Sequence, residues 1–303
     1  MTDFIVQKLL ISLAQRIRNK VYPLLNAEHS RGVAGVAHSG DVTFQIDVIA
    51  EQEVENYLSQ SKLKVAYYTE DKGLVAKVPL PDWILIIDPI DGTRPAFSGF
   101  ESTVVSIALC PYSANPTFKD ITHAAILEIK TGNLFYAEAG KGVWLHGDDP
   151  MLTINPSQTN ELEIIRWSFE LVGRPVEWII KEIGSLINLS SFKGGIYIFN
   201  SSAFALTRIV TGQLDAYLDI AGRIVDDGKT NTHLPQISNQ DQVMGLFAYD
   251  IAAAYLIVKE CHGVISDSWG EPLDNKSLIS KNILSCVAAS NAELHQKLIK
   301  WIG

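Results

Sequence analysis

An apolar run that ends in a turn with two acidic residues constrains this chain more than any other stretch. Residues 83–87 have the length and composition of a buried β-strand, and Asp88-Pro89-Ile90-Asp91-Gly92-Thr93 follows them directly. Proline lacks the N–H that a strand ladder needs, and glycine lets the backbone approach a ligand closely. The segment therefore predicts a buried strand that delivers two carboxylates and a hydroxyl to a site for metal and phosphate.

Composition and charge exclude several classes of protein. The chain has 303 residues, 47% of them hydrophobic, and a formal net charge of −9. These values predict a folded protein with a real core, built as one large domain or as two smaller ones that share a site. A nucleic-acid binder or a protein of anionic membranes needs basic surface, so we expect neither partner. A negatively charged protein repels phosphate, so an acidic protein that binds phosphate needs a locally positive site. Bound cations would provide that positive charge.

The cysteines and the hydropathy pattern bear on the compartment. Cys110, Cys261 and Cys286 lie far apart without a C-x-x-C pair, which indicates neither a disulfide framework nor a zinc ribbon. We interpret them as buried side chains in a reducing environment. No apolar run approaches membrane-spanning length. The sequence therefore predicts a cytoplasmic protein without a membrane partner.

The first half of the chain is predicted to hold two helices and a mostly antiparallel sheet. The second helix, over about 46–58, is expected to carry Glu51, Glu53 and Glu55 on a solvated face. The segment 29–42 has three glycines and little periodicity, so it is either a mobile loop or a plain surface connector. The strands are expected over 64–68, 83–88, 103–109, 122–129 and 134–137. Glycines and prolines near the middle suggest a boundary between residues 1–153, an N-terminal α+β half, and 154–303, a C-terminal α/β half.

The second half alternates strands and helices. Ser201 or Ser202 is expected to cap a helix that ends near Gly212, and such a helix N-terminus is also an anion site. Asp250 opens a strongly periodic helix, where an acid is by itself an ordinary N-cap. Residues 220–248 form a long polar insert, either a lid or a surface insertion. Further helices are expected over about 175–183 and 291–301, and strands over 164–169, 196–199, 215–219, 264–266 and 283–289.

Several acids stand at the ends of these predicted elements. Magnesium takes hard oxygen ligands and keeps some of its waters, so its sites gather a few carboxylates from different chain segments. Glu70, Asp88, Asp91 and Asp250 are such candidates. Glu70, together with the Thr93 hydroxyl, could orient or deprotonate an attacking water.

Other catalytic schemes fit less well. A phosphatase with an aspartyl-phosphate intermediate has one residue between its two acids, whereas Asp88 and Asp91 are separated by two. Direct attack by water is therefore favoured over a covalent intermediate. The chain also has no H-E-x-x-H, G-x-S-x-G or G-x-x-x-x-G-K-[ST] pattern, which disfavours zinc peptidase, serine hydrolase and P-loop chemistry.

Taken together, the motifs resemble those of the inositol monophosphatase family. This family belongs to the lithium-sensitive, magnesium-dependent sugar-phosphatase superfamily that also holds fructose-1,6-bisphosphatases and 3′-phosphoadenosine-5′-phosphate nucleotidases. The matching segments occur in the family's order: Glu70-Asp71, the hexapeptide Asp88 to Thr93, Asn200-Ser201-Ser202-Ala203, 212–217, and Tyr249-Asp250-Ile251-Ala252-Ala253 followed by Gly263.

The resemblance implies a fold, a cofactor and a set of roles. The fold would be α+β, a layered α-β-α-β-α sandwich in a homodimer, and the reaction would be hydrolysis of a small phosphate monoester with two to three Mg²⁺ ions. Asp47 would border the third ion, and Glu70 and Thr93 would activate the water. The implied metal ligands are Glu70, Asp88, the Ile90 carbonyl, Asp91 and Asp250. The implied substrate contacts are Asp91, Gly92, Thr93, Ser201, Ser202 and Asp219.

Departures from the family pattern bear on the substrate rather than on the carboxylates. Tyr249 stands where the family usually has Trp, Asn200 where it has Gly, and Asp71 where it has a second Glu. A polyol or sugar phosphate is the expected substrate. One alternative is a fructose bisphosphatase or nucleotidase whose insert provides a second phosphate site. The basic residues available for such a site are Arg223, Lys229 and His233. Another alternative is a regulatory relative that binds metal without turnover.

Overall fold

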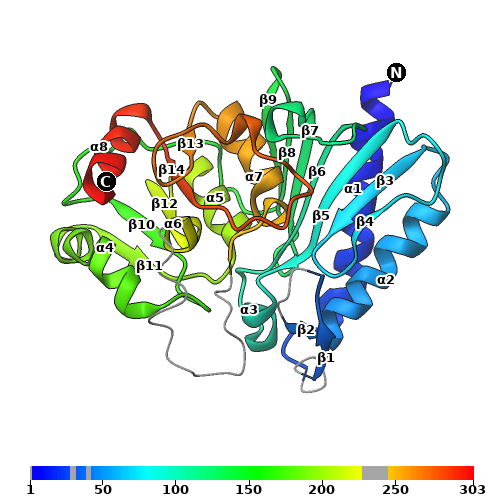
Figure 1. Ribbon diagram of the computed structural model, residues 1–303, viewed down its shortest axis with the longest axis horizontal. Helices are drawn as coiled ribbons and strands as arrows, with labels where there is room; N and C mark the ends of the chain where they lie inside the picture. The colour runs from blue at the N-terminus through cyan, green and yellow to red at the C-terminus, as the bar shows by residue number, and fades with distance from the viewer. Residues whose placement is uncertain (1, 28–31, 39–41, 227–244) are drawn as a thin grey trace.

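The computed structural model describes residues 2–27, 32–38, 42–226 and 245–303, and it has the predicted α-β-α-β-α layers. Figure 1 shows two sheets with helices between them and on both outer faces. The larger sheet has the order β4-β3-β5-β6-β7-β8-β9, and the smaller one β11-β10-β12-β14-β13. We propose a domain boundary at residues 153/154. In the chain it comes after the last strand of the larger sheet and before the first strand of the smaller sheet.

The elements have the following bounds. The helices are α1 (Thr2–Val21), α2 (Gln45–Ser59), α3 (Thr93–Ser98), α4 (Val176–Ser190), α5 (Ser202–Val210), α6 (Ala221–Asp226), α7 (Ala248–Glu260) and α8 (Ala292–Ile302). The strands of the larger sheet are β3 (Val65–Thr69), β4 (Gly73–Val75), β5 (Trp83–Asp91), β6 (Val104–Pro111), β7 (His123–Glu128), β8 (Leu134–Glu138) and β9 (Gly142–His146). Those of the smaller sheet are β10 (Arg166–Phe169), β11 (Gly195–Tyr197), β12 (Ala216–Asp219), β13 (Val264–Ser266) and β14 (Cys286–Ala289). A separate ribbon pairs β1 (Val33–Val36) with β2 (Val42–Phe44).

Strand β5 lies inside the larger sheet, between β3 and β6, and does not end where the sequence suggested. It runs parallel to β3 and antiparallel to β6, which confirms a mostly antiparallel sheet. Asp88 pairs with Ser106 and Asp91 with Val104, so β5 carries one extra residue across this stretch. Such a bulge accommodates Pro89, which has no N–H to give the ladder. The strand therefore continues through the proline to Asp91, and both acids belong to it.

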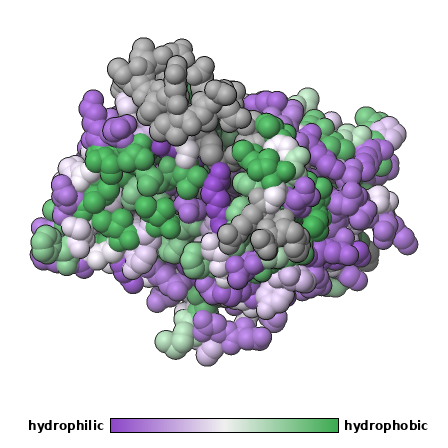
Figure 2. Space-filling view, turned by 90° about the horizontal axis from the view of Figure 1, so that it is seen from below, coloured by the Kyte–Doolittle hydropathy of each residue, from purple (hydrophilic) through white to green (hydrophobic). Residues whose placement is uncertain are grey.

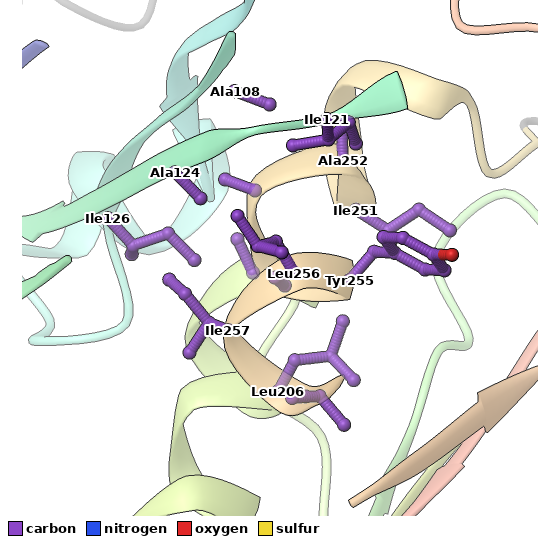
Figure 3. Close-up of a cluster of buried hydrophobic side chains, with 14 of the residues drawn as sticks. Ala108, Ile121, Ala124, Ile126, Leu206, Ile251, Ala252, Tyr255, Leu256 and Ile257 are labelled. Carbon is purple, nitrogen blue, oxygen red and sulfur yellow. The ribbon is translucent and has the colours of Figure 1, made fainter. Parts of the chain in front are cut away.

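Helices α5 and α7 fill the space between the two sheets. In Figure 3, Leu256 and Ile257 of α7 lie on the side that faces β6 and β7, whereas Ile251 points to the opposite side of the helix. Leu206 of α5 lies beside the next turn of α7. Residues 251–258 are all buried, because α7 has a sheet or a helix on nearly every side. Apolar side chains all around a helix are typical of such an inner layer.

The outer layer of the first half corrects the prediction of a solvated acidic face on α2. Glu51 and Glu53 are buried, since α2 packs against both α1 and β5. Glu53 accepts a hydrogen bond of 2.6 Å from Arg16 of α1. Of the three glutamates only Glu55 is partly exposed, where it pairs with Lys72 and Lys77. Sequence periodicity alone did not show that α1 covers this side of the helix.

The punctuated middle of the chain and the insert also differ from expectation. Residues 142–146 form β9 and complete the larger sheet, and α4 extends to Ser190. The Gly-rich segment contributes β1 and β2. The insert begins with α6, in which the Arg223 guanidinium donates to the Ile302 carbonyl. Arg223 is therefore engaged at the C-terminal helix, while Lys229 and His233 lie outside the described residues.

A search of the described helices for membrane spans finds no helix that is both long and apolar enough to cross a bilayer.

One buried ion pair joins the helical middle layer to the larger sheet, and its loss is a test of the packing. Arg208 of α5 donates to Glu128 of β7, and their side chains are 8% and 1% exposed. Removing one partner of a buried pair leaves an uncompensated charge. We expect Arg208→Met to lower the free energy of unfolding by about 3–5 kcal/mol in urea titrations.

Lys193→Met is the control, because the Lys193–Glu163 pair is exposed and such pairs contribute about 1 kcal/mol or less. A loss for Arg208→Met no larger than that of the control would contradict the role of this pair.

Candidate active site

The bulge of β5 and the N-terminus of α5 meet at Asp91. The Asp91 carboxylate accepts hydrogen bonds from Ser201 Oγ at 2.9 Å and from the Ala203 N–H at 2.6 Å. Ser201 is also the N-cap of α5, since its Oγ accepts from the Phe204 N–H at 3.3 Å, as the sequence predicted. A helix N-terminus favours a negative charge. Ser202, next in the chain, accepts a 2.7 Å hydrogen bond from the Tyr217 hydroxyl.

Asp88, Asp91, Asp250 and Glu70 are near enough to influence one another. Burial raises the pKa of Asp88 well above its usual value, and the carboxyl groups of Asp91, Asp250 and Glu70 raise it further. Burial likewise raises the pKa of Asp91 to about 6, with the hydrogen bonds from Ser201 and Ala203 acting in the opposite direction. The structure thus brings together the four acids that the sequence placed at separate element ends.

Asp250 is not the N-cap that the sequence suggested. Helix α7 begins at Ala248 with Phe247 as its N-cap, and the Asp250 carboxylate accepts a 2.6 Å hydrogen bond from the Phe247 N–H. Its position in the first turn still favours a negative charge. Burial, followed by the charge of Asp91, nevertheless raises the pKa of Asp250 well above its usual value.

A second group of acids lines a small cavity beside Asp88. Asp47, Glu51, Glu70, Asp71 and Asp88 surround it together with Pro89 and Ile90. The Thr93 hydroxyl lies 3.0 Å from the Asp47 carboxylate and 3.2 Å from the Ile90 carbonyl, and its one hydrogen can be donated to either acceptor. The structure thus places Thr93 and the Ile90 carbonyl next to this cavity.

Glu51 is a cavity residue that the sequence analysis assigned to solvent. Burial raises the pKa of Glu51 to about 7, although a hydrogen bond with Thr69 lowers it in part. It stands four residues after Asp47 on α2, and side chains at that spacing share one face of a helix. The i, i+4 spacing to Asp47 was the signal that could have identified it.

Gly92 is required by its surroundings. It has φ of +92°, and a Cβ built on it would lie 2.3 Å from the Ser102 carbonyl oxygen and 3.1 Å from the Ser201 Cβ. The backbone at the start of α3 is therefore packed directly against the N-cap of α5. Asn200, which precedes Ser201, also has a positive φ of 54°, a conformation that asparagine tolerates better than most residues.

Asp219 lies in a further buried polar cluster that includes Glu170 and Arg174. One Asp219 oxygen accepts from Arg174 and the other from the Ala221 N–H at 2.9 Å. Burial raises the pKa of Glu170 to about 8, and the Arg174 charge opposes this rise. Sequence reasoning missed both residues. Glu170 could have been identified as an acid at a strand end, because it directly follows the last residue of β10.

The donor set fits a hard divalent cation that keeps other ligands. Among residues 2–27, 32–38, 42–226 and 245–303, no three His, Cys, Asp or Glu side chains are arranged so that they alone could hold a metal ion. Magnesium usually retains waters and takes phosphate oxygens as well, so a partial set of carboxylates is what it requires. The mutual repulsion of Asp88, Asp91 and Asp250 is also the kind that a bound cation would relieve.

The face of the molecule near α3 is shown in Figure 2, which views Figure 1 from below. Strongly hydrophilic side chains gather near the middle of this face, between apolar areas. Polar groups at the centre of such a face are typical of a surface that admits a polar ligand.

Comparison with known proteins shows the same relationship along nearly the whole chain. The model of the inositol monophosphatase family matches residues 4–302. A fructose-1,6-bisphosphatase/inositol-1-monophosphatase of Methanothermobacter thermautotrophicus is 25% identical over 96% of this chain and 94% of its own length. Human inositol monophosphatase 1 is 26% identical over 73% of this chain and 66% of its own length. A bifunctional NADP phosphatase/NAD kinase of Methanocaldococcus jannaschii is 25% identical over 98% of this chain, which spans 50% of that protein.

Solved structures share the fold. The extragenic suppressor protein SuhB of Bartonella henselae superposes with a TM-score of 0.72 at 21% identity, over 98% of both chains. An inositol monophosphatase from Anabaena gives a TM-score of 0.69 at 16% identity, over 100% of this chain and 96% of that one.

The tight packing at Gly92 predicts that a single methyl group is poorly tolerated. Gly92→Ala adds both an unfavourable φ and a contact with the Ser102 carbonyl, so we expect the free energy of unfolding to fall by about 3 kcal/mol or more. Gly140→Ala is the matched control, because Gly140 has φ of +75° and nothing within 4 Å of its added Cβ. That variant should lose only about 1–2 kcal/mol. Equal losses in urea titrations would show that the contact at Gly92 is unimportant.

The buried Glu170 carboxyl predicts a pH-dependent stability. Its pKa is about 8 in the folded chain and 4.5 in the reference state, so the folded state binds the proton more tightly. Stability from this group is therefore lost as pH rises from about 4.5 to about 8. Glu170→Gln cannot ionise, so its melting temperature minus that of the wild type should increase across this range and then level off.

Glu163→Gln, at an exposed position, is the control and should show no such trend. A constant difference between Glu170→Gln and the wild type from pH 5 to 9 would refute the assignment.

Proposed function

The chain belongs to the inositol monophosphatase family and is a phosphoric monoester hydrolase, and we propose that it hydrolyses a small polyol or sugar phosphate with Mg²⁺ and an activated water. The observation that carries this proposal is the convergence of Asp88, Asp91 and Asp250, from β5 and α7, beside the N-terminus of α5.

The acids would hold the cations. Glu70, Asp88, Asp91, Asp250 and the Ile90 carbonyl are the proposed ligands, and Asp47 would border a third ion. When bound, Mg²⁺ lowers the pKa of a coordinated water and offsets the charge of the phosphate. The buried position of Asp88 and Asp91 favours this role, because isolated carboxylates would otherwise be costly to ionise there.

The remaining groups would position the water and the ester. The Thr93 hydroxyl, held between Asp47 and the Ile90 carbonyl, would orient the attacking water, and Glu70 would accept its proton. Backbone N–H groups of Gly92 and Thr93 would hold the phosphate. Ser201, Ser202 and Asp219 would face the hydroxyls of the alcohol. No covalent intermediate is part of this proposal, because the spacing of Asp88 and Asp91 does not match an aspartyl-phosphate motif.

The alternatives within the superfamily have less support. The bisphosphatase and nucleotidase hypotheses depended on basic residues of the insert, and Arg223 is already engaged by the Ile302 carbonyl. The hypothesis of an inactive metal-binding relative is opposed by the full set of carboxylates. We also propose that the protein is a homodimer, as the family resemblance implies, and light scattering after size-exclusion chromatography tests this oligomeric state. The proposed cytoplasmic location comes from the cysteines and the hydropathy pattern of the sequence.

Phosphate release from a substrate panel tests the proposal. The panel contains inositol 1-phosphate, fructose 1,6-bisphosphate, histidinol phosphate and 3′-phosphoadenosine 5′-phosphate, each with and without Mg²⁺. We expect release to require Mg²⁺ and to be inhibited by Li⁺. Asp88→Asn should lower kcat/KM by more than about 100-fold, because it removes a proposed cation ligand.

Asp149→Asn is the control, since Asp149 is exposed and distant in the chain from the acids. Wild-type protein that releases no phosphate from any of these esters would contradict the proposed function. Asp88→Asn with near wild-type activity would contradict the assignment of this residue.

A further inference from the structure

We propose that Arg174 is a positioning residue for substrate recognition, which fixes the Asp219 carboxylate so that it selects esters of polyhydroxy alcohols. This inference rests on the proposed function and names a determinant of specificity for the same site.

The first step is the geometry of Asp219. Its two carboxylate oxygens have different partners, Arg174 on one side and the Ala221 N–H on the other. Arg174 is in turn held by the Val172 carbonyl, which accepts from Nη1 at 2.7 Å. The side chains of Arg174 and Asp219 are 7% and 1% exposed. Asp219 is therefore locked in one orientation, and a carboxylate locked in this way can accept hydroxyl hydrogen bonds only from a defined direction.

The second step is the electrostatics of the neighbourhood. The Arg174 charge acts on the buried Glu170 carboxyl and opposes the rise of its pKa, whereas the Asp219 charge adds to that rise. Arg174 thus supplies a buried positive charge beside both the Asp219 and the Glu170 carboxyl groups.

The third step is a comparison with the other buried arginine–acid pair. Arg208 donates through Nε, Nη1 and Nη2, and its partner Glu128 also accepts from Thr131 and Asn133. In the described part of the chain, by contrast, Arg174 Nε and Glu170 Oε1 are buried without a hydrogen-bond partner. In an ion pair that only stabilises the fold, every buried polar atom is expected to have a hydrogen-bond partner, since unpaired buried polar groups cost free energy. The unpaired atoms of Arg174 and Glu170 therefore point to a role of this cluster in the reaction.

A pair of substrates separates recognition from folding. Inositol 1-phosphate is the ester of a polyhydroxy alcohol, whereas p-nitrophenyl phosphate is the ester of a phenol and has no aliphatic hydroxyls. Arg174→Met should raise KM for inositol 1-phosphate by about tenfold or more, with kcat changed less than about threefold. Its kcat/KM for p-nitrophenyl phosphate should also change less than about threefold. Arg174→Lys, which keeps the charge but not the planar fork, should give an intermediate KM.

A double-mutant cycle tests whether Arg174 acts through Asp219. The double variant Arg174→Met/Asp219→Asn should have the KM of Asp219→Asn alone, because the carboxylate that Arg174 positions is already absent. Arg166→Met is the matched control, since Arg166 of β10 pairs with Asp215, the residue just before β12, but is half-exposed. That variant should leave KM unchanged for both substrates.

Some results would overturn the inference. Equal losses on both substrates, or additive effects in the cycle, would show that Arg174 has only a structural role. Where Arg174→Met does not fold, Arg174→Lys decides, and an unchanged KM for inositol 1-phosphate in that variant overturns the inference. Wild-type protein inactive on both esters would instead contradict the proposed function, which distinguishes the two failures.

Discussion

The architecture of the site depends on the bulge that carries β5 past Pro89 to Asp91. Without the extra residue, Asp91 would fall out of register with β6, and its carboxylate would not reach Ser201 and the N-terminus of α5. The bulge thus connects the larger sheet to the helices of the middle layer. Asp250 on α7 arrives from the same layer, because α7 packs across β5, β6 and β7. The site is therefore a product of how the middle helices dock on one sheet.

This arrangement concentrates acidic side chains in a buried place, at an energetic cost to the folded chain. Burial and mutual repulsion raise the pKa of Asp88 and Asp250 well above their usual values. Burial also raises the pKa of Asp91, and Ser201 and the N-terminus of α5 offset only part of that rise. Arg174 contributes one compensating charge from the side of the smaller sheet. In our account, bound cations contribute the rest, and the same electrostatic imbalance that destabilises the empty cluster creates affinity for metal and phosphate.

The sequence predicted most strands and the acids at their ends, because strand periodicity and turn residues are local properties. The cap by Ser201 was local too. The layered arrangement was implied by the family resemblance, not by these local patterns. Other features depend on contacts between distant segments. Nothing near Glu51 and Glu53 reveals that α1 covers α2, and nothing around Asp219 reveals Arg174, which lies 45 residues earlier in the chain. The bulge at Pro89 was likewise hidden, since proline suggested the end of a strand. The first turn of α7 was misplaced because Phe247, an unusual N-cap residue, precedes it.

The central claim is that the carboxylates around β5 are assembled to hold cations, and the most direct test is the thermal stability of the wild-type chain at about pH 8 as Mg²⁺ is added. A cation that binds only the folded state stabilises it by RT ln(1 + [Mg²⁺]/Kd), about 2.7 kcal/mol at a hundredfold excess over Kd. The account predicts that the melting temperature rises with Mg²⁺ and, above Kd, keeps rising in proportion to the logarithm of the Mg²⁺ concentration. A melting temperature that stays constant up to tens of millimolar Mg²⁺ would contradict it.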